Sequence, residues 1–311
     1  MKNKPFLSID EQIELLEQRN LKFSSESEKN KFKLYLKMYG YQNFVNGYND
    51  FFFVNEDRKM RKYKSNARPS NIISLFNFDR GISNFILSNI QNVERKISSL
   101  IIYAMNKWVN ENGFFDRFKN GKILDINNKD WNLLFPYDSS LSLRKEIIDK
   151  LWILRYNNLI LKYKDNLKMC PIWIFMILMS FGTIIDIYKK INDDIKFIIL
   201  KNINVYSSKY FLSILVILKE TRNRICHNNV LYNIKKKIVV NGSKNIKIRL
   251  FDIVNILDAL NNKNRNGLEF QSLRFIFIQK INKYINNDSF DTEISAKILN
   301  YIHYKNKNEG Q

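Results

Sequence analysis

Residues 71–108 read NIISLFNFDRGISNFILSNIQNVERKISSLIIYAMNKW, and this stretch decides the fold. Its apolar side chains recur every three or four positions, at Leu75, Phe78, Ile82, Phe85, Ile86, Ile90, Val93, Ile97 and Ile101. That spacing is typical of an α-helix with one buried face. The stretch therefore predicts a long amphipathic helix.

Shorter segments on both sides repeat the helical spacing. Before the long helix, Ser8 and Glu11 form a capping box that opens a helix at 8–18, and a second helix at 27–39 ends before Gly40. Residues 112–138 look irregular. After them, we expect helices at 142–165, 171–190, 193–201, 207–226, 252–262, 268–285 and 292–304. The sequence thus predicts a mainly α protein built as a helical bundle.

The spacing changes near residue 234. Two short apolar segments, 234–240 and 246–251, flank Asn241-Gly242-Ser243-Lys244-Asn245, and Asn-Gly is a strong hairpin turn signal. We expect a small β-hairpin there, inserted in a helical domain over 71–311. Residues 1–70 would form an N-terminal helical segment, and both parts would belong to one compact unit.

The net charge is +21 over 311 residues, and a field of that size attracts polyanions. Nucleic acid is the first candidate partner, and an anionic membrane surface is the second. The chain is also rich in Lys, Asn and Ile together, so a general compositional bias is the alternative source of the charge.

Two cysteines, Cys170 and Cys226, provide no disulfide framework, which favours a reducing cytoplasm. The residues after Met1 lack the apolar core of a signal peptide. The apolar run at 169–181 is too short to span a bilayer. We therefore expect a cytoplasmic protein outside the membrane. The chain shows no cluster with metal-ligand spacing, so we expect no metal and no cofactor.

Residues 222–227 read Arg222-Asn223-Arg224-Ile225-Cys226-His227 and close the expected helix at 207–226. In a continuous helix, Asn223 and His227 lie on one face, and the long Arg222 side chain reaches the same place. Histidine exchanges protons near pH 7, and arginine holds phosphate through paired hydrogen bonds. The combination suits cleavage of RNA, whose 2′-OH supplies the nucleophile. The alternative is that His227 only caps the helix and Arg222 is a surface cation.

Six segments of the chain carry a family resemblance. They are KPFLSIDEQI at 4–13, YGYQNFVNGY at 39–48, LFNFDR at 75–80, NVER at 92–95, PIW with SFGT at 171–183, and RNRICHN at 222–228. In this order they resemble the AbiD/AbiF group of abortive-infection proteins, which are bacterial anti-phage and toxin-like factors. Gln42 departs from the family's arginine, and little resembles the family beyond residue 230.

The resemblance implies a HEPN-type helical fold and a toxin-like ribonuclease that associates with structured non-coding RNA. In such enzymes a histidine moves protons and an arginine holds the RNA phosphate, roles that fall here to His227 and Arg222, with Asn223 orienting either one. HEPN toxins silenced by adenylylation carry a tyrosine two positions after the histidine. This chain has Asn229 there, so the resemblance does not extend to that control.

The chain has two histidines, His227 and His303. Cleavage that uses two imidazoles needs a second histidine beside His227. His303 lies in a lysine-rich segment, which predicts a surface position. A two-fold dimer would bring His227 of both copies into one cleft, and the resemblance also favours paired HEPN units. We therefore expect a homodimer.

Two basic segments are candidates for RNA contact. The first contains Arg58, Arg61, Lys62, Tyr63, Lys64 and Arg68, in which a ring able to stack on a base lies among cations. The second lies on the expected hairpin and contains Lys235, Lys236, Lys237, Lys244 and Lys247. A solvated charge run is the alternative for either segment.

Glu94 and Arg95 are candidate supporting residues of the site, and a structural ion pair on the long helix is the alternative. Other side chains are predicted to be structural. They are Asp79 with Arg80 as a pair that locks the fold, Trp173 and Phe181 as core, and Cys226 as a small buried filler.

The sequence as a whole predicts a metal-independent endoribonuclease that leaves a 2′,3′-cyclic phosphate and a 5′-OH. Two other classes stay open. One is a non-catalytic RNA-binding protein in which the R-N-x-x-x-H segment is vestigial, and the other is a toxin that acts at a membrane surface.

Overall fold

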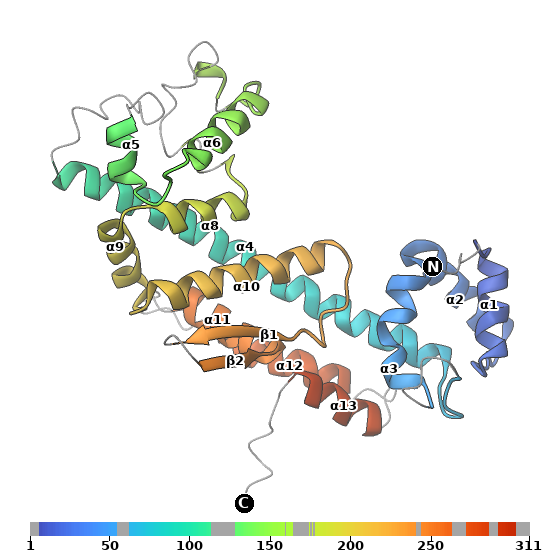
Figure 1. Cartoon of the computed structure of the whole chain (residues 1–311). Coiled ribbons are helices and arrows are strands. Elements are labelled where there is room, and N and C mark those ends of the chain that lie inside the picture. The colour runs from blue at the N-terminus through green and yellow to red at the C-terminus, as the bar shows by residue number, and fades with distance from the viewer. Residues whose placement is uncertain are drawn as a thin grey trace, which may run out of the picture.

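The computed structural model describes residues 6–54, 62–112, 128–158, 160–163, 174, 176, 178–240, 244–262, 272–285 and 292–302. Across these residues the protein is mainly α with one small antiparallel hairpin, as the sequence predicts. Figure 1 shows the helices arranged along and around one long helix, α4.

Helix α4 covers Pro69–Glu111, which confirms the long helix predicted from its apolar stripe. Pro69 lies in the first turn after the extended Arg68, where its missing N–H costs no hydrogen bond. Its 43 residues rise about 65 Å, enough for elements at both ends of the molecule to share it. The predicted stripe is buried except for Phe85, which is partly buried.

The N-terminal elements lie at the start of α4 (Figure 1). They are α1 Ile9–Gln18, α2 Glu26–Phe44, the 3-10 helix η1 Asn46–Tyr48 and α3 Asn49–Phe52. The capping box of Ser8 and Glu11 is confirmed. The expected interruption at Gly40 is confirmed, because Gly40 is non-helical at φ 74°, but a second helical piece follows this kink as far as Phe44. Only glycine adopts that φ without steric cost.

Near the other end of α4 lie α5 Asn128–Leu134, α6 Ser142–Ile153 and the 3-10 turn η2 Leu161–Tyr163. Helix α5 was not expected from the sequence. Helix α6 ends at Ile153 instead of continuing to 165, because Asn157 and its neighbours form turns. The buried Asp138 carboxylate accepts the N–H of Leu143 at 3.0 Å and Lys190 Nζ at 2.9 Å, which joins α6 to the next part of the chain.

Three helices follow: α8 Phe181–Lys190, α9 Asp193–Ile203 and α10 Ser208–Cys226. Each begins at a polar N-cap residue, Ser180, Asn192 or Ser207, whose side chain accepts a backbone N–H of the first turn. The single helix expected at 171–190 is therefore wrong, because the Ser180 cap starts a new helix at Phe181. The helices expected at 193–201 and 207–226 are confirmed.

The C-terminal part contains β1 Lys236–Val240, β2 Lys244–Ile248, α11 Leu250–Asn262, α12 Leu273–Ile285 and α13 Thr292–Ile302. The two strands pair antiparallel, with Val240 opposite Lys244 at the turn end and Lys236 opposite Ile248 at the other. The predicted hairpin is confirmed with slightly shorter strands. It lies beside α10, while α11 and α12 pack on α4 (Figure 1).

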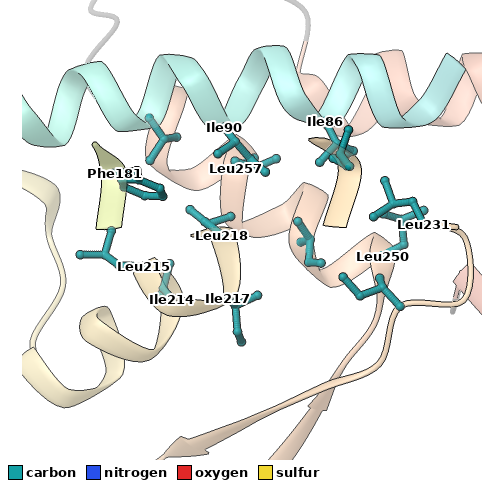
Figure 2. Packing of buried hydrophobic residues seen from close by; sticks show 14 of the residues in the cluster. Ile86, Ile90, Phe181, Ile214, Leu215, Ile217, Leu218, Leu231, Leu250 and Leu257 are labelled. Atoms are coloured by element: carbon teal, nitrogen blue, oxygen red, sulfur yellow. The ribbon is translucent and has the colours of Figure 1, made fainter. Parts of the chain in front are cut away.

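The core forms where α4 meets α8, α10 and α11 (Figure 2). Ile86 and Ile90 of α4 are fully buried and lie among Phe181, Leu218 and Leu257 from those three helices. Burial of each such side chain contributes about 1.5–3 kcal/mol. The expected core role of Phe181 is confirmed, and this packing holds the C-terminal half of α10 against α4.

Gly47 lets η1 approach the segment that follows α10. A Cβ on Gly47 would lie 2.4 Å from Cγ2 of Val230, closer than two carbons can pack. We predict that Gly47→Ala lowers the free energy of unfolding by about 1–3 kcal/mol, as overpacking of a filled site does. Urea denaturation measures the loss, and Val230→Ala should remove most of it in a double-mutant cycle.

Gly182 provides the matched control for Gly47. A Cβ there would meet its nearest neighbours at 3.6 and 3.8 Å, which is ordinary contact, and the residue lies in helix α8. Gly182→Ala should leave stability unchanged or raise it slightly, since alanine is the better helix former. Equal losses for the two substitutions would contradict the close approach of η1 and Val230.

Candidate functional site

The predicted motif lies at the C-terminal end of α10. Arg222 and Asn223 are half-buried in the last helical turns, and His227 is the exposed C-cap residue. The His227 N–H donates to the Asn223 carbonyl at 3.0 Å, and Arg222 Nη1 donates to Asn223 Oδ1 at 3.3 Å. Helix geometry therefore groups the three predicted residues within about one and a half turns, at a place open to solvent.

The helix ends in a reverse turn built by two asparagines. Asn228 has φ 55°, a left-handed conformation that asparagine tolerates. The Asn229 N–H donates to the Arg224 carbonyl at 3.0 Å and the Asn228 N–H to the Ile225 carbonyl at 2.9 Å. This pair of bonds is a Schellman motif. It satisfies the last carbonyls of the helix and reverses the direction of the chain.

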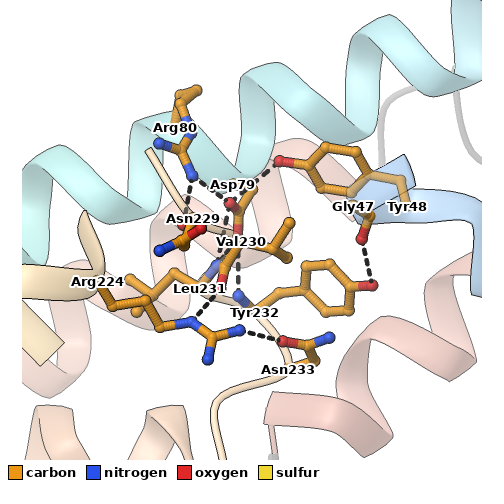
Figure 3. A network of polar contacts seen from close by, with 10 residues as sticks. All are labelled: Gly47, Tyr48, Asp79, Arg80, Arg224, Asn229, Val230, Leu231, Tyr232 and Asn233. Atoms are coloured by element: carbon orange, nitrogen blue, oxygen red, sulfur yellow. Dashed lines mark hydrogen bonds and ion pairs between the residues drawn. The ribbon is translucent and has the colours of Figure 1, made fainter. Parts of the chain in front are cut away.

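The segment after the turn is held by one buried carboxylate, Asp79 of α4 (Figure 3). Asp79 is 0% exposed, and its Oδ1 accepts the N–H groups of Leu231 at 3.0 Å and Tyr232 at 2.7 Å. Its Oδ2 accepts the Tyr48 hydroxyl at 3.1 Å and Arg80 Nη2 at 2.8 Å. The expected fold-locking role of Asp79 and Arg80 fits this geometry.

Two arginines, Arg80 and Arg224, also hold this segment. Together with Asp79, Tyr48 and residues 229–233 they form a network that we call the Asp79 lock. Arg80 Nη2 also donates to the Asn229 carbonyl at 2.9 Å. Arg224 donates through Nε to the Val230 carbonyl and through Nη2 to Asn233 Oδ1 at 2.9 Å (Figure 3). Burial lowers the pKa of Arg224, and the charge of Asp79 opposes that effect. Arg224 is thus a structural arginine inside the motif.

Tyr48 and Tyr232 connect the Asp79 lock to the N-terminal elements. Burial raises the pKa of Tyr48 well above its ordinary value, and the nearby charge of Asp79 adds to the effect. Burial likewise raises the pKa of Tyr232. Both side chains therefore keep their hydroxyl protons, and the Tyr232 hydroxyl donates a hydrogen bond to the Gly47 carbonyl at 3.3 Å.

Glu94 of α4 faces the motif helix. Half-burial raises the pKa of Glu94, while the charge of Arg222 and a hydrogen bond from the Phe181 N–H oppose that rise. Its carboxyl group therefore lies near Arg222 and the start of α8. Arg95 points elsewhere and donates from Nη2 to Asn92 Oδ1 at 2.6 Å. The structure brings Glu94, and not Arg95, toward the motif.

The first basic segment is only partly described. Arg58 and Arg61 lie outside the described residues, whereas Lys62 and Arg68 are exposed and Lys64 is half-buried. The expected stacking role of Tyr63 is wrong, because its ring is 2% exposed and packs edge-on against Phe53 at 4.8 Å. Its pairing with Phe53 in an isolated bridge carries it into the core.

The hairpin lysines lie next to the motif helix. Lys236 forms an ion pair with Glu220 of α10, and Lys235 lies over the Tyr301 ring at 5.7 Å. Lys237 and Lys247 are exposed and directly opposite one another across the strands. Like charges in that position repel each other. The side chain of Lys244 is not among the described ones.

Three predicted residues remain: the prediction for Cys226 is wrong, and those for Trp173 and His303 are not tested. Cys226 is exposed at the helix end, so the expected buried filler is wrong, because the residue falls on the outer side of the last turn. Trp173 and His303 lie outside the described residues. The N–H groups of Leu231 and Tyr232 that bind Asp79 could not be predicted, since backbone donors leave no mark in the residue pattern.

The fold and the site define a class: a mainly α protein in which an Arg-Asn…His helix end is pinned to a long central helix. A protein-family model of Abi-like proteins matches residues 34–233, and the chain belongs to that family. The matched range runs from α2 to the last residues of the Asp79 lock. Neither the curated proteins nor the solved structures provide a match.

Two further properties of the described residues concern metal binding and membrane insertion. Within the ranges given above, His, Cys, Asp and Glu side chains form no group of three that would suit a metal ion. Across the same ranges, every helix is too short or too polar to cross a bilayer.

Removal of the Asp79 charge tests the lock. We predict that Asp79→Asn lowers the free energy of unfolding by about 3 kcal/mol, because it leaves Arg80 and backbone donors without their buried partner. Urea denaturation provides the measurement. Asp186→Asn is the control: Asp186 pairs with Lys189 at the surface, where such a pair is worth less than about 1 kcal/mol. Similar losses for both variants would contradict the lock.

Proposed function

We propose that this protein is a HEPN-type, metal-independent endoribonuclease of the cytoplasm that acts in abortive infection. The Abi-like family suggests the anti-phage role. The observation that carries the enzymatic proposal is the placement of Arg222, Asn223 and His227 within about one and a half turns, at a solvent-open helix end. A phosphodiester needs such access.

The reaction follows from the chemistry of the three side chains. His227 takes the proton of a ribose 2′-OH, and the oxygen forms a bond to the adjacent phosphorus. The bond from phosphorus to the 5′-oxygen breaks, and a second imidazole supplies the proton that this oxygen needs. Arg222 neutralises the charge that builds on the phosphoryl oxygens. The products are a 2′,3′-cyclic phosphate and a 5′-OH.

Glu94 supports this reaction by holding Arg222. The charge of its half-buried carboxylate acts on the Arg222 guanidinium and favours one orientation of that side chain. A donor group that is already oriented stabilises charge without reorganisation during the reaction. Glu94 therefore acts as a positioning residue in the proposal, and Arg95 has no part in it.

The hairpin supplies the proposed RNA-binding surface. Lys237 and Lys247 repel each other across the strands, and a polyanion placed between them would relieve that repulsion. The hairpin lies beside α10, so its charges reach the region of the motif. Its RNA partners would include a substrate and a structured non-coding RNA, as in the AbiD/AbiF group that the sequence resembles.

Cleavage of labelled single-stranded RNA in EDTA tests the enzymatic proposal. We expect the wild-type protein to leave cyclic phosphate ends, and Arg222→Ala and His227→Ala to lower the rate at least about 100-fold, the usual effect of losing a proton-transfer or charge-stabilising group. Arg155→Ala is the matched control, since Arg155 is also half-buried but lies beside Trp152 and Tyr156. It should cleave at the wild-type rate.

Each other outcome of this assay points to a definite class of protein. Tight RNA binding without cleavage by the wild-type protein would favour the non-catalytic RNA-binding alternative. Equal cleavage by all variants would show that the motif is not the catalytic site. Binding to anionic vesicles with no affinity for RNA would favour the membrane-surface toxin.

The second imidazole leads us to propose a homodimer. The exposed His227 has room for a second copy, and the chain's other histidine, His303, is read as a surface residue. Two copies related by a two-fold axis would then bring both His227 side chains to one scissile phosphate, because a two-fold interface repeats each contact.

A mixing experiment tests the dimer. We expect light scattering to give twice the chain mass, and His303→Ala to keep full cleavage. Co-expression of wild-type chains with excess Arg222→Ala, His227→Ala chains should lower the activity per wild-type chain, because most wild-type copies then lie in mixed dimers. A monomeric active enzyme, or loss of cleavage in His303→Ala, would contradict the composite site.

A further inference from the structure

A groove lies where the C-terminal end of α4 meets α9, away from the motif. Its volume is about 750 Å³, and its walls include Tyr103, Lys107 and Trp108 from α4 and Phe197, Lys201 and Asn202 from α9. Trp108 lies 14 positions after Glu94 on the same helix, which corresponds to about 21 Å. The groove is therefore distinct from the place where Glu94 meets Arg222.

Three aromatic rings line the groove, and two of them are exposed. Tyr103 is 53% exposed and Phe197 67% exposed, while Trp108 between the walls is 7% exposed. Trp108 Nε1 donates to Asp194 Oδ2 at 3.4 Å, which fixes the ring and gives the Asp194 carboxylate a partner. Large rings held open to water on facing helices offer flat apolar surface to a ligand.

Polar groups stand at the edges of this aromatic surface. Lys107 and Lys201 provide one cation on each wall, and Asn202 lies beside them. Glu111 pairs with Lys107 at 3.6 Å, but both side chains are about half exposed, so solvent screens the pair and an incoming anion can replace it. The cations remain available to a polyanion, within a chain whose net charge is +21.

We propose that this groove binds the bases of single-stranded RNA. Aromatic rings that stack on bases, together with lysines that follow the phosphates, are the combination used by single-strand binding sites. A duplex hides its base faces, so it would not use the rings. The choice of RNA rests on the proposed function, but the groove is distant from His227 and its binding does not require cleavage.

Binding to a chain that cannot cleave tests the groove separately from the nuclease. The parent protein carries His227→Ala, and the probe is a fluorescent, unstructured oligouridine of about 12 nucleotides, within the usual length of single-strand sites. In this background, Phe197→Ala and Tyr103→Ala should each weaken binding about 5- to 150-fold, as expected for one lost stacking contact. Fluorescence anisotropy measures both affinities.

Phe275→Ala is the matched control, because Phe275 is 48% exposed on α12 and does not line the groove. It should bind like the parent. An abasic strand of equal length keeps the phosphates, so it should bind the parent more weakly and show no further loss with Phe197→Ala.

Several results would overturn the proposal. These are unchanged binding by both groove variants, an equal loss with Phe275→Ala, tight binding of the abasic strand, and no binding of the oligouridine by the parent. Absence of nuclease activity in the wild-type protein would leave all these measurements intact, so the two proposals fail in different ways.

Discussion

The arrangement of the motif depends on one buried carboxylate. Asp79 has no exposed surface, so its charge must be met by donors inside the protein. Those donors come from three regions distant in sequence: Tyr48 of η1, Arg80 of α4, and the N–H groups of Leu231 and Tyr232. The charge is satisfied only when all three regions meet. The segment after His227 therefore has one position relative to α4, and the helix end that carries the motif is fixed with it.

Asp79 and Glu94 both lie on helix α4. The contacts of Asp79 therefore also set where α10 lies along that helix. Asp79 and Glu94 are 15 positions apart, about 22 Å in a straight helix. Helix α10 packs along α4 with its C-terminal end toward Asp79 (Figure 1). Arg222 consequently lies near Glu94 while residues 231 and 232 reach Asp79. The packed core of Ile86, Ile90 and Leu218 lies on the same interface and keeps the two helices from sliding.

Periodicity and capping signals predicted most of the fold. They indicated the long helix, the helix that ends in the motif, and the hairpin, because these elements bury one face and carry strong local caps or turns. They failed at Ser180, where a helix cap interrupts the apolar pattern. They also failed at Tyr63, whose bridge to Phe53 carries the ring into the core. The grouping of Arg222, Asn223 and His227 could be read from helical spacing. The approach of Glu94 could not, since it depends on how two helices pack.

The two arginines of the motif, Arg222 and Arg224, make different contacts. Arg222 and Arg224 are two positions apart, so they project from different sides of α10. Arg224 turns toward the lock and holds the Val230 carbonyl and Asn233, which leaves its guanidinium committed. Arg222 lies near the charge of Glu94, and its Nη1 donates to Asn223 Oδ1 at 3.3 Å. Exchange of the two roles would require α10 to rotate by about half a turn, and the Asp79 contacts to residues 231 and 232 oppose that rotation. The same buried charge that fixes the turn therefore also keeps Arg222 and Arg224 on different sides of α10.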